Sequence, residues 1–224
     1  MVRLLRAPGV YAPQDDTDLL VEALRAAAIP AGARVLDIGT GTGALAIAAI
    51  RAGAAEVTGV DVSRRAVWTA RVNAALRRLP LRVRLGNALE VIADERFDLV
   101  LANPPYVPAA GSCAARGAAR AWDAGLDGRQ LLDPLCARMF GLLVPGGVLL
   151  MVHSELCGVD TTLRQLRDSG LKASVVHRRS VPFGPVMTGR IGFLEQHGLI
   201  EPGRRHEELV VIRGDRPERP QSHH

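Results

Sequence analysis

The stretch Val35-Leu36-Asp37-Ile38-Gly39-Thr40-Gly41-Thr42-Gly43 has the pattern of a buried β-strand, a glycine-rich turn and a helix start. Glycines in such a turn let the backbone approach a ligand closely, and the helix N-terminus that follows attracts anionic groups. The spacing Gly39-x-Gly41-x-Gly43 differs from the G-x-G-x-x-G of dinucleotide-binding enzymes. The Asp37 carboxylate supports the same distinction, because it would repel a pyrophosphate and can pair with an ammonium group. The stretch therefore predicts a ligand site of an α/β fold that does not bind a dinucleotide.

Short β-type runs alternate with helical patterns in the rest of the chain, which is typical of a doubly wound α/β fold with a parallel sheet. The expected strands are Arg34–Ile38, Glu56–Val60, Arg82–Gly86, Phe97–Ala102, Val148–Val152, Lys172–His177 and Glu208–Arg213. The expected helices are Asp18–Ala28, Gly43–Ala52, Ser63–Leu76, Arg129–Leu143 and Val159–Ser169.

Two longer stretches, residues 107–128 and 178–207, do not fit this alternation. Long irregular segments in a compact domain are usually functional or disordered. We expect the first to be a substrate lid, because it directly follows the motif described below. We expect the second to extend a hairpin between the last two strands.

The size and composition predict a single domain. With 224 residues and 48% hydrophobic residues, the chain is long enough for one well-cored domain and short for two. We expect this domain to cover residues 1–214 and a flexible tail to cover 215–224. No apolar run reaches the roughly 18 residues of a membrane span, and the N-terminus lacks the apolar core of a signal peptide. A cytoplasmic protein without membrane contact is therefore expected. The cysteines Cys113, Cys136 and Cys157 match neither a zinc motif nor a disulfide framework, so no metal site is predicted.

Polar side chains stand at the carboxyl ends of consecutive strands. Asp61 ends the second strand, where an acidic residue binds ribose hydroxyls, and Asn87 follows the third, where a polar group would contact adenine. S-adenosylmethionine carries an ammonium, a carboxylate and a sulfonium but no phosphate, so it suits this loop and these acidic residues. The predicted cofactor-binding residues are Thr17, Asp37, Gly39, Thr40, Gly41, Thr42, Gly43, Asp61, Val62, Asn87, Ala88 and Asn103.

The tetrapeptide Asn103-Pro104-Pro105-Tyr106 directly follows the apolar strand Phe97–Ala102. Each prolyl ring fixes φ and removes a backbone donor, so the segment is stiff and has free carbonyl groups. A planar NH2 group could donate its two N–H groups to the Asn103 side-chain carbonyl and the Pro104 carbonyl, with its π face against Tyr106. Beside a methyl-donating cofactor, all four residues are predicted to form the catalytic site that holds the methylated nitrogen.

Three further residues have two interpretations each. Thr17 is an N-cap candidate of the first helix together with Asp15 and Asp16, or it also forms a wall of the cofactor site. Trp122 anchors the lid or contacts the substrate. His153 is interpreted as a satisfied core histidine rather than a catalyst.

These residues resemble class I S-adenosylmethionine-dependent methyltransferases, and within them the HemK family of protein-glutamine N5-methyltransferases. The resemblance extends from Tyr11 to about Arg213 and includes three more segments: Tyr11–Thr17, Ala121–Arg129 and Glu207–Ile212. It implies a Rossmann-like sheet of seven strands with an antiparallel last strand. It also implies methylation of a Gly-Gly-Gln glutamine in peptide-chain release factors.

The chain departs from the family pattern in two respects. The N-terminal helical domain of the bacterial enzymes is missing before the core, so the chain is more similar to the short archaeal and eukaryotic members. Those members need a small zinc-binding activator subunit, and the resemblance therefore raises an activator as a partner. Asn87 replaces the usual Asp after the third strand, and Ala88 occupies a position that is often aromatic.

Several alternatives stay open from the sequence. The tetrapeptide also occurs in methyltransferases that act on exocyclic amino groups of adenine or guanine in RNA or DNA, and a small-molecule amide is a further acceptor class. The net charge of +5 and the paired arginines are compatible with an RNA- or ribosome-facing surface, and equally with a solvated charged face. A third interpretation is a non-catalytic cofactor-binding scaffold for a partner subunit.

Overall fold

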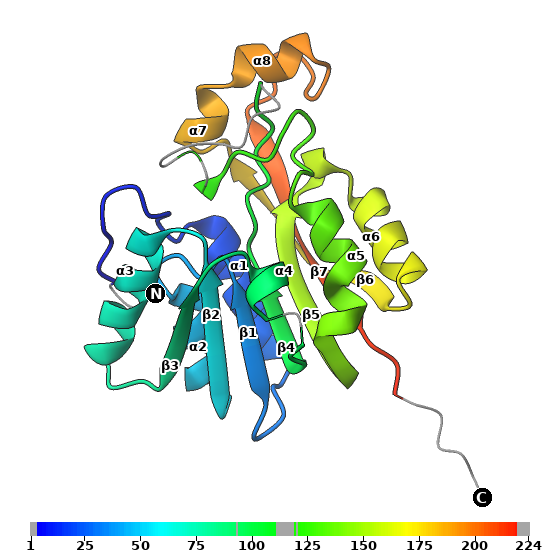
Figure 1. The fold of residues 1–224 in the computed structure, drawn as a ribbon. Helices are drawn as coiled ribbons and strands as arrows, with labels where there is room; N and C mark the ends of the chain where they lie inside the picture. Colours follow the sequence, from blue (N-terminus) through cyan, green and yellow to red (C-terminus); the bar gives the residue numbers. More distant parts are fainter. Residues whose placement is uncertain (1–3, 93, 111–118, 120, 219–224) are drawn as a thin grey trace, which may run out of the picture.

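The computed structural model describes residues 4–92, 94–110, 119 and 121–218. Its centre is a seven-stranded sheet in the order β3-β2-β1-β4-β5-β7-β6 (Figure 1). The strands are β1 (Arg34–Ile38), β2 (Glu56–Asp61), β3 (Leu81–Leu85), β4 (Phe97–Ala102), β5 (Leu143–Ser154), β6 (Lys172–Pro182) and β7 (His206–Asp215). Strands β1 to β5 pair in parallel, and β7 lies antiparallel between β5 and β6. The expected doubly wound sheet with an antiparallel last strand is confirmed.

Helices cover both faces of the sheet (Figure 1). The helices are α1 (Asp15–Ala26), α2 (Ala44–Arg51), α3 (Arg64–Ala75), α4 (Ala88–Val91), α5 (Leu132–Leu142), α6 (Val159–Asp168), α7 (Pro185–Thr188) and α8 (Ile191–Gln196), with a 3₁₀ turn η2 (Glu155–Cys157). Helices α1 and α2 bury one face of the sheet in an apolar core, and α4, α5 and α6 bury the other. Both cores contain alternate residues of the central strands, because successive strand side chains point to opposite faces.

Helix α1 begins at Asp15, three residues earlier than expected. Its N-cap is Gln14, whose side chain makes no capping hydrogen bond. Asp15, Asp16 and Thr17 therefore lie in the first turn, where acidic side chains interact favourably with the helix dipole. The interpretation of these three residues as N-caps is wrong.

The boundary between α5 and β5 also differs from the expectation. Helix α5 begins at Leu132 rather than Arg129, and Leu143 belongs to β5 instead of ending the helix. The strand begins five residues earlier than expected because Leu143 pairs with Phe97 across a shift in the β4–β5 register.

Residues 178–207 form the expected hairpin extension. Strand β6 continues to Pro182, which pairs with His206 at the start of β7. The connection holds α7 and α8, which were not predicted, and they bury a separate apolar cluster containing Phe183, Met187 and Leu194. In Figure 1 these two helices lie above the sheet, beyond the end of the hairpin.

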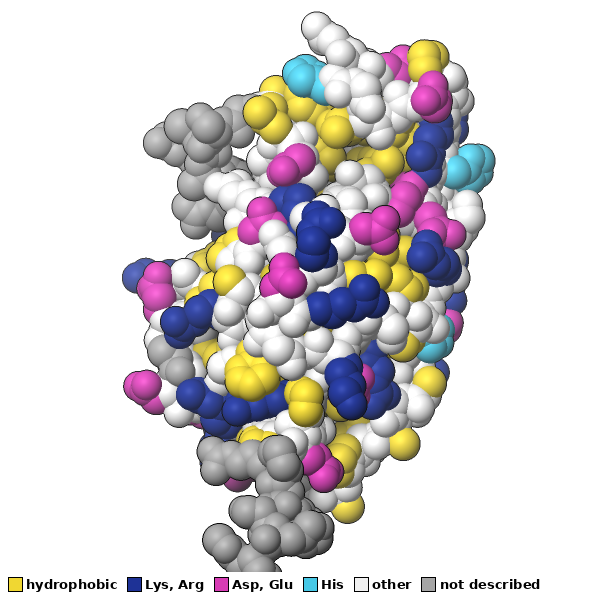
Figure 2. Space-filling view, turned by 90° about the vertical axis from the view of Figure 1, so that its right-hand side faces the viewer, with side chains coloured by type: hydrophobic (Ala, Val, Ile, Leu, Met, Phe, Trp, Pro, Cys, Tyr) yellow, Lys and Arg dark blue, Asp and Glu magenta, His cyan; other side chains and the backbone are white. Residues whose placement is uncertain are grey.

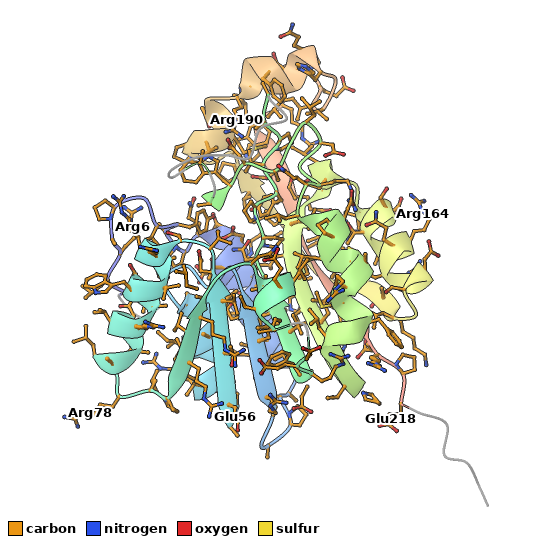
Figure 3. All side chains as sticks on the ribbon, in the orientation of Figure 1. Arg6, Glu56, Arg78, Arg164, Arg190 and Glu218 are labelled. Atoms are coloured by element: carbon orange, nitrogen blue, oxygen red, sulfur yellow. The ribbon has the colours of Figure 1, made fainter. Side chains whose placement is uncertain are left out.

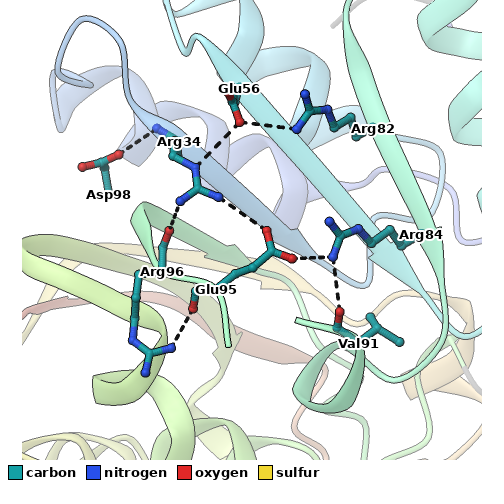
Figure 4. Close-up of polar contacts among 8 residues, drawn as sticks. All are labelled: Arg34, Glu56, Arg82, Arg84, Val91, Glu95, Arg96 and Asp98. Atoms are coloured by element: carbon teal, nitrogen blue, oxygen red, sulfur yellow. Dashed lines mark hydrogen bonds and ion pairs between the residues drawn. The ribbon is translucent and has the colours of Figure 1, made fainter. Parts of the chain in front are cut away.

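An ion-pair network connects neighbouring strands on the β3 side of the sheet (Figure 4). Arg34 lies within 3.7 Å of Glu56 and 3.4 Å of Glu95, and the same two acids pair with Arg82 and Arg84 of β3. These side chains are partly exposed, so each pair stabilises the fold by at most about 1 kcal/mol. The network links Arg34 and Glu56, at the amino ends of β1 and β2, to β3 and to Glu95, which precedes β4.

The C-terminal strand extends to the first residue of the segment expected to be a tail. Asp215 pairs with Lys172 and Val148. The next residue, Arg216, donates to the backbone carbonyls of Phe140 and Leu143 at 2.9 and 2.5 Å. Residues 219–224 lie outside the described part of the chain.

Within the described ranges, none of the helices has the length and apolar composition needed to cross a membrane.

Candidate active site

Two strand ends bring the glycine-rich loop and the tetrapeptide together. Ile38 and Ala102 are the last residues of β1 and β4 and are partners in the parallel register. The residues that follow them, Gly39 and Asn103, are therefore neighbours. A Cβ built on Gly39 would lie 3.9 Å from the Asn103 backbone oxygen. The glycine-rich loop and the tetrapeptide were predicted from separate motifs, and the sheet places them side by side at the carboxyl ends of its parallel strands.

A first cavity opens at this edge, and we call it the donor cavity. The predicted residues that line it are Thr17, Gly39, Thr40, Gly41, Thr42, Asp61, Val62, Asn87, Ala88, Asn103, Pro104 and Pro105. Gly43 and Asp37 are not among the lining residues. Gly43 instead caps α2 in a left-handed conformation, and its Cα packs so closely on α3 that a Cβ would lie 3.3 Å from the Ala70 Cβ.

Asp37 does not line the donor cavity in this structure, and its expected pairing with a cofactor ammonium stays a prediction. Asp37 is fully buried, and its Oδ2 accepts hydrogen bonds from the Thr40 hydroxyl at 2.7 Å and the Ala46 N–H at 3.1 Å. Its Oδ1 has no hydrogen-bond partner in the described part of the chain. Burial raises the pKa of Asp37 to about 6. The carboxylate therefore shapes the loop from below rather than facing the cavity.

Gly59 is a loop-shaping residue that the sequence analysis missed. It lies in β2 opposite Asp37 of β1. A Cβ at this position would lie 2.7 Å from the Thr40 Oγ1 and 3.0 Å from the Thr40 Cβ. Only glycine leaves room for the Thr40 side chain that binds Asp37. A glycine inside an apolar strand pattern is the signal that could have revealed this close approach.

Asp61 and Asn87 lie on the rim of the donor cavity, as their positions at the strand ends predicted. The Asp61 carboxylate accepts from the Gly41 N–H at 2.9 Å and the Ser63 N–H at 2.8 Å. Burial raises the pKa of Asp61. The Asn87 side chain accepts from the Leu89 N–H and so caps α4. Their contacts with ribose and adenine stay predictions.

A second cavity, which we call the acceptor cavity, meets the donor cavity at the tetrapeptide. Tyr11, Pro104 and Pro105 line both cavities, whereas Tyr106 lines only the second. The other walls of the acceptor cavity come from the start of α1, from Trp122 and from the end of β6 through α7. The stiff Pro104-Pro105 segment therefore forms the boundary between two adjoining cavities.

Two acidic side chains beside the acceptor cavity were not predicted as site residues. Asp16 and Glu207 are 3% and 6% exposed, and both line the cavity. The Glu207 Oε2 has no hydrogen-bond partner among the described residues, and burial raises the pKa of Glu207 to about 7. The hydroxyls of Tyr11 and Tyr106 both donate to the Asp16 Oδ2, at 2.8 and 3.2 Å. Burial raises the pKa of Tyr106 well above its usual range.

The two long segments meet above the acceptor cavity. The backbones of Val107 and Asp123 pair, and Trp122 packs on the apolar cluster of α7 and α8 while lining the cavity. Arg190, labelled in the upper part of Figure 3, forms an ion pair with Asp123 and donates to the Pro108 carbonyl at 2.9 Å. Both interpretations of Trp122 are compatible with this position. The lid role of residues 107–128 stays a prediction, and residues 111–118 and 120 lie outside the description.

The remaining candidate side chains within the described residues are buried and line neither cavity, and the prediction of a satisfied histidine at His153 holds for Nδ1 but not for Nε2. His153 is fully buried, its Nδ1 lies 2.7 Å from the Ser154 carbonyl, and its Nε2 has no partner among the described residues. Burial lowers the pKa of His153 to about 4, so it stays neutral. Cys136 and Cys157 are buried thiols, and the Cys157 Sγ donates to the Tyr106 carbonyl at 3.1 Å. Cys113 lies outside the described residues.

The lining of the donor cavity fits S-adenosylmethionine. The described lining residues include Asp61 but no lysine or arginine. Such a wall offers no counter-charge for a pyrophosphate and tolerates a sulfonium cation. The glycine-rich loop lies at the start of α2, where backbone N–H groups would meet a carboxylate. The loop, Asp61 and Asn103 would together hold this cofactor beside the tetrapeptide.

The comparisons with known proteins agree with this fit. The family model described as the methyltransferase small domain matches residues 1–117. A Methanocaldococcus jannaschii protein named for protein N5-glutamine methyltransferase activity is 33% identical over 187 residues, covering 83% of this chain and 93% of the relative. The release factor glutamine methyltransferase of Deinococcus radiodurans is 38% identical over 205 residues, covering 86% of this chain and 68% of the relative.

Solved structures show the same fold at lower sequence identity. A chain of the E. cuniculi Mtq2–Trm112 complex, which is responsible for the methylation of the eRF1 termination factor, has a TM-score of 0.63 and 21% identity. The match covers 93% of this chain and 99% of that one. The T. thermophilus 16S rRNA N2 G1207 methyltransferase, solved with AdoMet and guanosine, has a TM-score of 0.59 and 20% identity. That match covers 96% of this chain and 46% of the other.

Proposed function

This chain belongs to the methyltransferase small domain family, and we propose that it methylates the side-chain amide nitrogen of a glutamine in a peptide-chain release factor. It is an S-adenosylmethionine-dependent methyltransferase, and the resemblance to the HemK family is confirmed by its relatives. The observation that carries the proposal is the meeting of two cavities at Pro104 and Pro105, directly after Asn103.

S-adenosylmethionine supplies the methyl group. An amide nitrogen is a poor nucleophile because its lone pair is conjugated with the carbonyl, and the rotation barrier of about 18–20 kcal/mol reflects that conjugation. The Asn103 side-chain carbonyl and the Pro104 carbonyl accept the two N–H groups and hold the NH2 in line with the donor. Both dipoles become more favourable as positive charge develops on the nitrogen, so they stabilise the transition state more than the ground state. After the transfer the nitrogen loses one N–H proton to water, which leaves a neutral N-methyl amide.

The acceptor cavity favours a peptide over a nucleobase. Its walls contain the acids Asp16 and Glu207, and its described lining residues include no lysine or arginine that could pair with a nucleic-acid phosphate. Several basic residues outside it pair with acids. Three groups of neighbouring arginines pair with acids: Arg82 with Glu56, Arg84 with Glu95, Arg178 with Glu208, Arg179 with Glu22, Arg204 with Glu155 and Arg205 with Glu195. Figure 2 shows basic and acidic side chains interspersed on one face.

The proposal is tested by finding where the methyl group goes. The protein is incubated with methyl-labelled cofactor, release factor and ribosomal RNA, and the products are digested with protease or with nuclease. Label that survives nuclease but not protease supports the proposal, and the reverse result supports the RNA alternative. A release factor whose Gly-Gly-Gln glutamine is replaced by alanine should take up no label. Absence of any label, with measurable cofactor binding, would favour the scaffold alternative.

A small activator subunit is part of the same proposal, because the E. cuniculi relative was solved as a two-protein complex. The labelling reaction is therefore run with the purified chain alone and with an extract of the source cells. Activity of the pure chain would show that no activator is needed. The cytoplasmic location and ribosome contact stay predictions.

A further inference from the structure

The buried Asp16 carboxylate receives four hydrogen bonds. Its Oδ1 accepts from the Thr17 N–H at 2.5 Å and the Thr17 hydroxyl at 3.1 Å. Its Oδ2 accepts from the hydroxyls of Tyr11 and Tyr106. Asp16 and Thr17 are 3% and 4% exposed, so this cluster is held away from bulk solvent.

The cluster continues to the tetrapeptide. The Asn103 Nδ2 lies 3.4 Å from the Thr17 Oγ1, although the two residues are 86 positions apart in the sequence. Asn103 and Thr17 both line the donor cavity. A path of two hydrogen bonds thus joins Asp16 to the side chain that is proposed to hold the methylated nitrogen.

The donors and acceptors along this path follow from the Asp16 carboxylate. A carboxylate only accepts hydrogen bonds, so the Thr17 hydroxyl donates its single proton to Asp16. The Thr17 oxygen is then left with lone pairs toward Asn103, and it can only accept. Asn103 must turn its NH2 toward Thr17, and its Oδ1 then lies on the other side of the amide.

We propose that Asp16 is a positioning residue, which acts through the Thr17 hydroxyl to fix the amide orientation of Asn103 so that Oδ1 meets the acceptor NH2. This inference rests on the proposed function, since it assumes an acceptor that donates N–H groups. The flipped amide would present its own NH2 to the acceptor, and two donors would face each other. The same carboxylate accepts hydrogen bonds from Tyr11 and Tyr106. One buried acid therefore fixes the orientation of the Asn103 amide and the positions of two side chains that line the acceptor cavity.

Two substitutions of Thr17 test the path. Thr17→Val keeps the shape and removes the hydroxyl, and we expect kcat to fall about 10- to 100-fold. Thr17→Ser keeps the hydroxyl and should stay within about threefold of the wild type. In Asp16→Asn the new side-chain NH2 can donate to the Thr17 oxygen, and the Thr17 hydroxyl can then donate to Asn103. The Asn103 amide would turn its oxygen toward Thr17, so kcat should fall as in Thr17→Val.

A double-mutant cycle separates orientation from packing. Asn103→Asp presents an oxygen in either orientation, so Thr17→Val in that background should lower the remaining rate by no more than about threefold. Equal losses in both backgrounds would overturn the proposal, because they would show that the hydroxyl acts through packing alone. A wild-type rate for Thr17→Val would overturn it as well. Thermal unfolding of each variant identifies losses that come from misfolding.

A measurement without methyl transfer distinguishes this proposal from the proposed function. The side-chain NH2 resonances of Asn103, assigned by their loss in Asn103→Asp, should exchange with water about tenfold faster in Thr17→Val than in the wild type. Faster exchange with no glutamine methylation would contradict the function and support the path. Unchanged exchange would contradict the path whatever the acceptor is.

Discussion

Gly128 lies directly against the backbone carbonyl of Tyr106, and a Cβ at this position would overlap that oxygen and lie 2.7 Å from the Cys157 Sγ. The φ of Gly128 is +76°, a conformation that other residues rarely adopt. The last residue of the tetrapeptide is thus held between a glycine 22 positions later and the Cys157 thiol, which donates to the same carbonyl. The backbone of the catalytic segment depends on a contact that no local pattern reveals.

Gly128→Ala should therefore reduce both stability and activity. We expect a loss of about 2–4 kcal/mol in the free energy of unfolding, from backbone strain and displacement of Tyr106. The matched control is Gly32→Ala, where φ is +83° and nothing lies within 4 Å of the added Cβ, so only the strain of about 1 kcal/mol applies. Urea unfolding of both variants measures the difference. Equal losses would contradict the importance of the contact.

Asn103→Ala should lower kcat about 100- to 1,000-fold, because it removes one of two acceptors of the amide NH2. The Kd for S-adenosylmethionine should change by only a few-fold. Asn87→Ala provides the control, since this amide also lines the donor cavity but caps α4. That variant should weaken cofactor binding with little change in kcat. Steady-state kinetics with a glutamine peptide and calorimetry with the cofactor give both quantities, and unchanged turnover of Asn103→Ala would refute the mechanism.

Asp37→Asn tests whether this carboxylate shapes the loop or pairs with the cofactor ammonium. The substitution places a buried NH2 where Oδ1 now has no partner among the described residues, which should weaken cofactor binding about tenfold. A loop-shaping role predicts the same loss for S-adenosylmethionine and for an analogue without the α-amino group. A larger loss for the cofactor that carries the α-amino group would support the predicted pairing of Asp37 with the ammonium.

Glu207→Gln should change how stability depends on pH. Burial raises the pKa of Glu207 from 4.5 to about 7, so between these pH values the folded protein retains a proton that the unfolded chain releases. The free energy of unfolding therefore falls as the pH rises through this window, and Asp37, with a pKa raised to about 6, contributes in the same direction. At pH 8 the Gln variant should be more stable than the wild type by about 2 kcal/mol. Unfolding curves at pH 5 and pH 8 measure the effect, and equal stabilities at pH 8 would contradict it.

Arg129→Met should destabilise the fold by about 3 kcal/mol, because a buried guanidinium leaves several acceptors unpaired. Arg129 donates to Asp133, Thr162 and Gln165 and to the Cys157 carbonyl, and so ties the start of α5 to η2 and α6. Arg164→Met on the exposed side of α6 should change stability by less than about 0.5 kcal/mol. Thermal unfolding of the two variants provides the comparison, and similar small shifts would contradict the role of Arg129.

Local sequence patterns were sufficient to predict the succession of strands and helices along the chain and the position of the main site. The nine residues from Val35 to Gly43 carry by themselves the pattern of a strand, a turn and a helix start. The strands Arg34–Ile38 and Phe97–Ala102 coincide with the expectation. Because parallel strands share one carboxyl edge, the loop, Asp61 and the tetrapeptide were predictable as one site.

Contacts between distant residues decided the rest. The surroundings of Asp37 depend on Thr40 and on Gly59 in the next strand, and these contacts show that the carboxylate supports the loop, which the sequence pattern did not reveal. Asp16 and Glu207 lie 191 positions apart in the numbering and meet only because β7 returns beside α1 at the acceptor cavity. Sequence patterns report local conformation and the burial of a face, which follow from steric and hydrophobic periodicity. The packing of the whole chain decides which carboxylates are buried and which hydrogen-bond donors replace water around them.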